Sequence, residues 1–141
     1  MIMIYAEYYE SGEIYSKCNY IDGKLHGESI IYFKSGEVES KYNFIEDKLH
    51  GESIHYFISG EIRSKCNHID GLENGECIGY YLSGEISFKF SYLNGLKNGE
   101  SIEYYESGEI SYKYYYIDGK SVIESEWVSY NRNLKLELLG L

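Results

Sequence analysis

The sequence predicts an all-β fold, built as an elongated antiparallel array of β-hairpin repeats. Three observations support this prediction. The sequence repeats itself every 24 residues, it contains 18 tyrosines and no proline, and glycine recurs at fixed places in every repeat. Tyrosine is a strand-favouring residue, whereas the helix formers Ala, Gln and Met are nearly absent. Because the chain has 141 residues, we expect one repeat domain, 1–141.

The period is marked by two kinds of dipeptide. Ser-Gly falls at 11–12, 35–36, 59–60, 83–84 and 107–108, and His-Gly or Asn-Gly ends at 27, 51, 75 and 99. The spacing of 24 residues never changes, which predicts five units and a C-terminal cap. The units span 4–27, 28–51, 52–75, 76–99 and 100–123, and residues 124–141 form the cap.

Each unit is predicted to contain two strands, as in 28–34 and 37–45. Ser-Gly joins the two strands, and the stretch from Asp-Gly to His-Gly leads to the next unit. Glycine suits both connections because it adopts positive φ at little steric cost. Ten consecutive strands, spaced about 4.8 Å apart, would extend over roughly 48 Å. Each unit would then touch mainly its two neighbours.

Two adjacent aromatic columns precede the Ser-Gly turns and are the candidate interaction surface. One column consists of Tyr9, Phe33, Phe57, Tyr81 and Tyr105. The other consists of Tyr8, Tyr32, Tyr56, Tyr80 and Tyr104. Neighbouring residues in a strand point to opposite faces, so one column packs in the core and the other lies on the less apolar face. The register across Ser-Gly is ambiguous by one residue, so the sequence leaves both assignments open.

In the second strand, even spacing predicts that three columns share a face. They begin at Ile14, Cys18 and Tyr20, and their other members follow at intervals of 24 residues. The opposite face carries the glutamates that begin at Glu13 and the lysines that begin at Lys17, and we expect it to be solvated.

Cysteine, histidine and glutamate give no site with chemical function. Cys18 and Cys66 occupy the same position two units apart, roughly 19 Å from each other, which is too far for a disulfide. Cys77 takes a position that serine holds in other units, so all three cysteines are expected as small fillers. His26 and His50 precede glycines and are expected as turn residues rather than metal ligands.

Repeated glutamates are too far apart to converge on one cation, and no glycine-rich phosphate loop precedes a helix. We therefore expect no enzymatic activity, no cofactor and no metal.

The formal net charge of -10 argues against partners that attract basic proteins, namely nucleic acid and anionic membrane surfaces. No long apolar run is present, and the N-terminus lacks the pattern of a signal peptide. These features, together with an odd number of cysteines, predict a cytoplasmic protein, or one of the host cytoplasm if the source is a virus.

The repeat breaks down after residue 123. Ile123 stands where earlier units have glycine, and the cap contains Trp127, Leu134, Leu136 and Leu138. We expect these four residues to cover the last hairpin, as a strand or a short turn of helix. The alternative is that they form the seam of a homodimer.

The consensus YYxSGEIxxKxxYxDGKxxGE resembles the MORN repeat, and more closely its variant in the YwqK antitoxin-like group; similar arrays occur in giant viruses. The resemblance covers about residues 4 to 123. It implies a hairpin ribbon that acts as an adaptor or scaffold with a protein partner. The alternatives it implies are an antitoxin or immunity protein and an oligomeric structural component, for example of a virus. A lipid-binding role, also implied by the resemblance, is disfavoured by the acidic charge.

Overall fold

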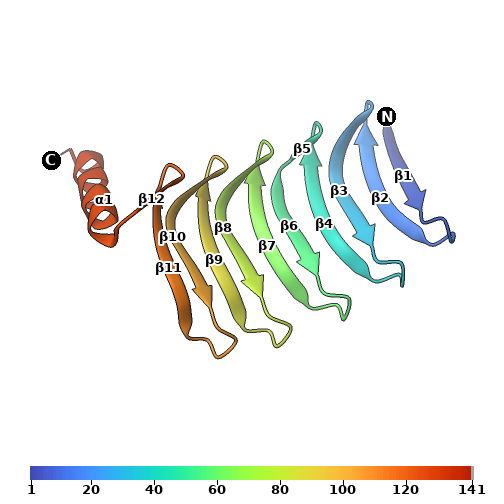
Figure 1. Ribbon diagram of the computed structural model, residues 1–141. Coiled ribbons are helices and arrows are strands. Elements are labelled where there is room, and N and C mark those ends of the chain that lie inside the picture. The colour runs from blue at the N-terminus through green and yellow to red at the C-terminus, as the bar shows by residue number, and fades with distance from the viewer. Residues whose placement is uncertain (141) are drawn as a thin grey trace.

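The computed structural model describes residues 1–140, which form one open antiparallel sheet and one C-terminal helix (Figure 1). The strands are β1 (Ile2–Tyr8), β2 (Ile14–Ile21), β3 (Lys24–Tyr32), β4 (Val38–Ile45), β5 (Lys48–Leu49), β6 (Gly51–Tyr56), β7 (Ile62–Ile69), β8 (Leu72–Tyr80), β9 (Ile86–Leu93), β10 (Leu96–Tyr104), β11 (Ile110–Ile117) and β12 (Lys120–Val122), and the helix is α1 (Glu124–Leu138). The predicted all-β hairpin array is confirmed.

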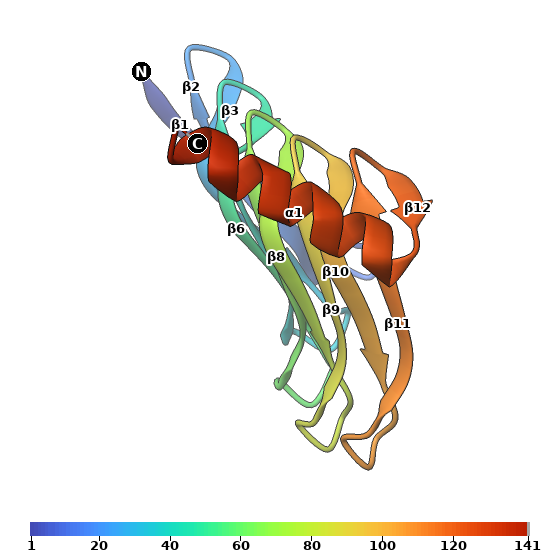
Figure 2. The same ribbon diagram turned by 90° about the vertical axis from the view of Figure 1, so that its left-hand side faces the viewer.

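Strands that are neighbours in the chain are neighbours in the sheet, apart from the short β5, which pairs with β4 beside β6. Figure 1 shows the strands standing in a row from β1 to β11, with the two termini at opposite ends. The view in Figure 2 shows a curved single layer, and α1 lies beyond its C-terminal end. Two additions raise the predicted ten strands to twelve: β5 is split from β6 at His50, and the short β12 pairs with β11 at the end of the fifth unit.

The turns between units need left-handed backbone at two consecutive residues. Asp22 has a φ of 50° and Gly23 a φ of 82°, which is the pattern of a two-residue type I′ hairpin turn. In the next turn, Glu46 and Asp47 adopt φ of 48° and 67° without a glycine. Short polar side chains such as Asp tolerate this region, which explains why the replacement does not break the array.

A bulge interrupts the second strand of every hairpin. In the first hairpin Glu7 lies opposite Ser16 and Tyr8 lies opposite Ile14, so Tyr15 has no residue opposite it. The same register shift occurs in the other four hairpins. One extra residue reverses the alternation of side chains, so positions on either side of the bulge no longer share a face when their spacing is even.

This bulge corrects the predicted faces. On β3, Ile30 and Tyr32 point to the same side; Ile30 lies opposite Lys41, and Tyr32 lies opposite Val38. The column of Ile14, Val38, Ile62, Ile86 and Ile110 therefore lies with the lysines, not with the columns of Cys18 and Tyr20 as the spacing predicted. We call this side the lysine face, after Lys17, Lys41, Lys65, Lys89 and Lys113.

The opposite side is the serine face, named after the column Ser29, Ser53, Cys77 and Ser101, and it holds the most buried residues of the sheet. Ser101 is 1% exposed and lies between Phe90 and Tyr114, its register partners on the two neighbouring strands. Aromatic pairs stack along this face, with ring centroids 4.6 Å apart for Phe88 and Phe90. Small residues beneath large rings thus make the core of a sheet that has no second layer.

Two of the three cysteines form a disulfide, so the expectation that all were fillers is wrong. Cys66 on β7 is bonded to Cys77 on β8, with 4.2 Å between their Cα atoms. The register places Cys18 opposite Ser29 and Cys66 opposite Cys77 of the next unit, which a comparison within one column misses. Cys18 is a free thiol, and its Sγ lies 2.7 Å from Ser29 Oγ.

The array ends where a glycine is missing. The equivalent glycines Gly27, Gly51, Gly75 and Gly99 have φ between 83° and 110°. Ile123 has a φ of -77° instead, because a β-branched residue is excluded from the left-handed region. The chain leaves the sheet there and forms α1, where Trp127 packs on Tyr115 with 5.0 Å between ring centroids.

The leucines of the cap do not cover the last hairpin, contrary to expectation. Leu134, Leu136 and Leu138 are 41%, 40% and 81% exposed. These leucines belong to a helix of fifteen residues, in which Leu134 and Leu138 share one side and Leu136 points to the other. Their alternation in the sequence therefore does not indicate a β-strand.

Candidate interaction surface

The column that begins at Tyr8 lies on the lysine face. Each tyrosine is opposite an aliphatic residue of the following strand, as Tyr56 is opposite Ile62. The two columns alternate along the array and form what we call the tyrosine stripe. Its members are Tyr8, Ile14, Tyr32, Val38, Tyr56, Ile62, Tyr80, Ile86, Tyr104 and Ile110.

Lysine stems border the stripe and cover part of it. The Nζ atom of Lys17 lies 5.9 Å from the ring centroid of Tyr32, within the range of a cation–π contact. A hollow of about 430 Å³ opens beside the stripe and is lined by Val38, Lys41 and Tyr56. Tyr8 is exposed, whereas the tyrosines inside the array are half-buried. The stripe is therefore an amphipathic surface with apolar rings and cationic edges.

The column that begins at Tyr9 has a different environment. The hydroxyl of Tyr9 donates a hydrogen bond of 2.7 Å to the backbone carbonyl of Tyr32 in the next unit, and Tyr81 donates one of 2.6 Å to Tyr104. Burial, followed by the carboxylate of Glu39, raises the pKa of Tyr9. These phenols join the first hairpin to the second and the fourth to the fifth.

The remaining members of this column complete the pattern. Phe33 and Phe57 occupy the position without a hydroxyl, and both are half-buried. Tyr105 belongs to the last hairpin, and it is exposed, since the described chain continues there as α1 rather than as a sixth hairpin. The two columns thus differ in what they touch: one faces the lysines, and the other bonds to backbone.

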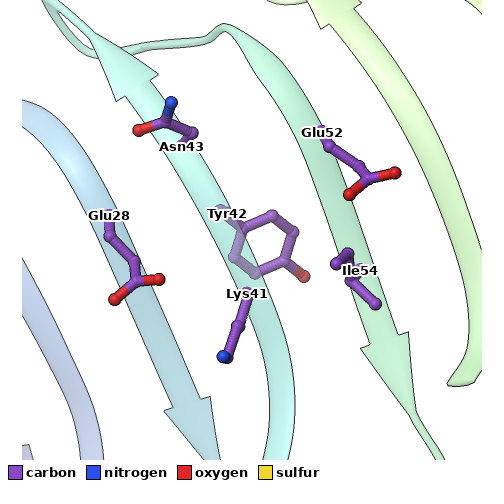
Figure 3. Close-up of a pocket in the computed structure, with 6 residues that line it drawn as sticks. All are labelled: Glu28, Lys41, Tyr42, Asn43, Glu52 and Ile54. Atoms are coloured by element: carbon purple, nitrogen blue, oxygen red, sulfur yellow. The ribbon is translucent and has the colours of Figure 1, made fainter.

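A row of glutamate and asparagine runs beside the lysines. Figure 3 shows Glu28 on β3, Lys41 and Asn43 on β4, and Glu52 and Ile54 on β6, around a hollow of about 390 Å³. The hollow is also lined by Tyr42. Glu28 and Glu52 come from strands on either side of β4, so their carboxylates do not form a pair.

An equivalent hollow occurs two units later, where a side chain of the helix also lines it. There it is lined by Glu76, Lys89, Ser91, Glu100 and Ile102, and it measures about 450 Å³. Trp127 of α1 also lines this hollow, together with Tyr104 of the tyrosine stripe. An aromatic side chain from outside the sheet therefore already borders one of these repeated hollows.

Charges on this face are partly paired. Glu100 lies 3.0 Å from Lys113, and this hydrogen bond is the main cause that raises the pKa of Lys113. Within residues 1–140, no His, Cys, Asp or Glu side chains gather in a group of three that could hold a metal ion. The described helix is not long and apolar enough to cross a membrane.

The histidines are placed individually. His26 and the equivalent His50 lie at an irregularity within or between strands, not in the hairpin turns where we expected them. His68 is buried, with its Nδ1 3.4 Å from Ser53 Oγ. His55 lies on the serine face 3.0 Å from Ser40 Oγ, and burial, followed by Arg63, lowers its pKa.

Comparison with known proteins agrees with the repeat geometry. The family model described as the MORN repeat variant matches residues 3–22, 25–46 and 97–118. No curated protein matches the sequence.

Two solved structures are similar in part. The crystal structure of accessory secretory protein 1, 2 and 3 in Streptococcus pneumoniae is 15% identical with a TM-score of 0.42, and the match covers 71% of this chain and 18% of that one. The GtfA/B complex bound to UDP and GlcNAc is 12% identical with a TM-score of 0.32, and the match covers 100% and 27%. The three stretches that the MORN repeat variant model matches follow the period and register described above.

Proposed function

We propose that this chain is a non-enzymatic protein-interaction or scaffold module whose contact surface is the tyrosine stripe. MORN repeats are generally protein or membrane interaction modules. The observation that carries the proposal is the continuous stripe of tyrosine and aliphatic side chains on the lysine face. Tyrosine is effective at interfaces because it is large, stiff and amphipathic.

The stripe is a better candidate than the column of Tyr9. The hydroxyls of Tyr9 and Tyr81 are engaged with backbone carbonyls, so a partner would have to compete with the contacts between units. The stripe repeats at about 9.6 Å, twice the strand spacing. A partner that touches several units gains avidity from contacts that are weak individually.

Charge suggests the chemistry of the partner. The chain has a net charge of -10, and Glu28 and Glu52 lie on the lysine face beyond the lysines that border the stripe. A basic protein would associate faster with such a surface, and this rate would fall as salt is added.

The experiment is affinity capture from the native host followed by mass spectrometry, with a stripe variant beside the wild type. The variant carries Tyr56→Ser and Tyr80→Ser, and the matched control carries Phe57→Ser and Tyr81→Ser in the adjacent column. We expect the stripe variant to lose the captured protein at a nearly unchanged melting temperature, and the control to melt at a lower temperature. Equal recovery of the same proteins by the wild type and the stripe variant would contradict the proposal.

A second candidate is an antitoxin or immunity protein, and the acidic charge favours it to the extent that the toxin is basic. Co-expression distinguishes this candidate, because a true antitoxin restores growth of cells that express the cognate toxin. A third candidate, an oligomeric structural component such as one of a virus, requires self-association.

A further inference from the structure

Within residues 1–140, the sheet has an unpaired strand edge at each end. Inside it, the second strand of each unit pairs with the first strand of the next, as β2 pairs with β3 and β7 with β8. Among residues 1–140, no strand pairs with the outer edge of β1 or with the outer edge of β11 from Ile110 to Tyr114. Figure 1 places these edges at opposite ends of the molecule. Each edge is one half of a contact that the array makes internally four times.

We propose that the chain associates head to tail, with β1 of one copy pairing antiparallel with β11 of another in the register of β2 and β3. Because the two surfaces differ, the contact is heterologous and does not close on itself, so it generates linear chains of copies. This proposal does not depend on the tyrosine stripe and goes beyond the proposed function.

The register follows from the internal contact. There Lys17 lies opposite Ile30, and Cys18 lies opposite Ser29. The residues equivalent to Lys17 and Cys18 on β11 are Lys113 and Tyr114, and those equivalent to Ile30 and Ser29 on β1 are Ala6 and Tyr5. Lys113 would therefore face Ala6 of the next copy, and Tyr114 would face Tyr5.

The side chains of the two edges are compatible in this register. Ala6 already lies opposite a lysine, Lys17, in its own hairpin. Tyr112 would face Glu7 of the next copy, and Tyr112 already lies opposite a glutamate, Glu103. Both edges also expose apolar groups: Met3, Ile4, Tyr5 and Tyr20 line an apolar hollow of about 320 Å³ at the β1 end.

The hydrogen bond between a tyrosine hydroxyl and the next unit lacks an acceptor at the β11 end and a donor at the β1 end. A second copy would supply the missing group at each end. Tyr9 and Tyr81 donate to the carbonyl of the tyrosine 23 residues later. Tyr105 is 55% exposed and has no such hairpin beyond it within the described chain. Its acceptor in a head-to-tail pair would be the carbonyl of Tyr8 of the next copy, a residue that is 62% exposed.

The C-terminal segment limits the contact to a short stretch, because β12 pairs with part of β11 and α1 lies beyond this end of the sheet. β12 pairs with β11 only from Tyr115 to Ile117, and Val122 and Ile123 are equivalent to Ile2 and Met3 of an incoming β1. In the register of β2 and β3, the residues of an incoming β1 that remain free to pair are Tyr5, Ala6 and Glu7. Such a small interface predicts weak association that depends on concentration.

The first test removes one hydroxyl group, that of Tyr105. In sedimentation velocity, the wild-type chain should increase in average mass with concentration. Tyr105→Phe should weaken this association roughly two- to tenfold, the effect of one hydrogen bond, without changing the melting temperature. The matched control Tyr81→Phe removes the equivalent bond inside the array, so it should lower the melting temperature and leave association unchanged. A wild-type chain that stays monomeric at every concentration overturns the proposal.

The second test traps the register. Cys66 and Cys77 show that this pair of positions can be bridged, and Tyr114 and Tyr5 are their equivalents across two copies. In a Cys18→Ser background, the variant with Tyr5→Cys and Tyr114→Cys should oxidise to a ladder of linked copies. The control with Tyr5→Cys and Lys113→Cys should not, because Lys113 points to the other face. Tail-to-tail dimers from Tyr114→Cys alone, in equal yield, would overturn the proposed arrangement.

Discussion

At Gly79 the size of one residue is matched to the residue opposite it. Gly79 on β8 lies opposite Phe88 on β9, and a Cβ atom added to this glycine would lie 2.1 Å from Cε1 of Phe88. In the preceding hairpin the sizes are reversed, since His55 lies opposite Ser64. A large side chain therefore faces a small one across the strand in both cases, which is how a single layer fills its serine face.

This arrangement predicts the effect of a single methyl group. Gly79→Ala should lower the free energy of unfolding by about 1–3 kcal/mol, because the ring of Phe88 must rotate away and lose its stack on Phe90. Adding Phe88→Ser, the residue found at Ser64, should make the alanine harmless. Urea unfolding of the two single variants and the double variant gives the coupling. If the losses of unfolding free energy in the two single variants simply add in the double variant, the ring of Phe88 is not what opposes the alanine.

At the scale of the strand and the turn, the sequence predicts the features that require glycine, namely the repeat units and their turns. The units and the turns such as Asp22-Gly23 are visible because left-handed backbone restricts the residue type. The bulge is invisible, since its column holds Tyr15, Glu39, Arg63, Ser87 and Ser111, which share no chemical property. Without the bulge, the column that begins at Ile14 is assigned to the wrong face.

The sequence also does not predict which aromatic column forms the candidate surface. Both aromatic columns can be read from the sequence, but their faces depend on the register across Ser-Gly. That register is set by backbone bonds, such as the one from the Tyr9 amide to the Glu13 carbonyl, and not by side-chain type. The cross-strand pair of Cys66 and Cys77 was missed for the same reason, because it joins two different columns.

The element that ends the array can be converted into a strand. Ile123→Gly restores the residue that allows left-handed backbone, and Glu126→Ile restores the isoleucine found at Ile30 and its equivalents. We expect residues 124–128 of this double variant to pair with β11, so that the helical signal in far-UV circular dichroism at 222 nm falls. Ile123→Ala should keep the helix. An unchanged helical signal in the double variant would mean that α1 forms independently of the missing glycine.

At the scale of the whole molecule, each unit contacts only its neighbours, so stability is close to a sum over units and junctions. The junction between units 52–75 and 76–99 differs from the others because the Cys66–Cys77 bond crosses it. The junction between the first two units has a thiol opposite a hydroxyl at the same place, Cys18 and Ser29. The middle of the array is therefore covalently linked, while the first junction is held by strand pairing and by hydrogen bonds such as that from Tyr9 to Tyr32.

The disulfide should make stability depend on redox conditions. Cys77→Ser, which restores the residue of the other units, should lower the free energy of unfolding by about 2–3 kcal/mol, the chain-entropy effect of a short closed loop. Reductant should lower the wild type to the level of this variant and should not affect the variant itself. Cys18→Ser is the matched control, because it removes a thiol that has no disulfide partner. Urea unfolding with and without reductant measures the wild type and both variants. An effect of reductant that persists in Cys77→Ser would mean that the effect does not come from the disulfide.

Conversely, Ser29→Cys should create a second cross-link opposite Cys18 and raise stability under oxidising conditions alone, because it reproduces the central junction at the N-terminal end of the array.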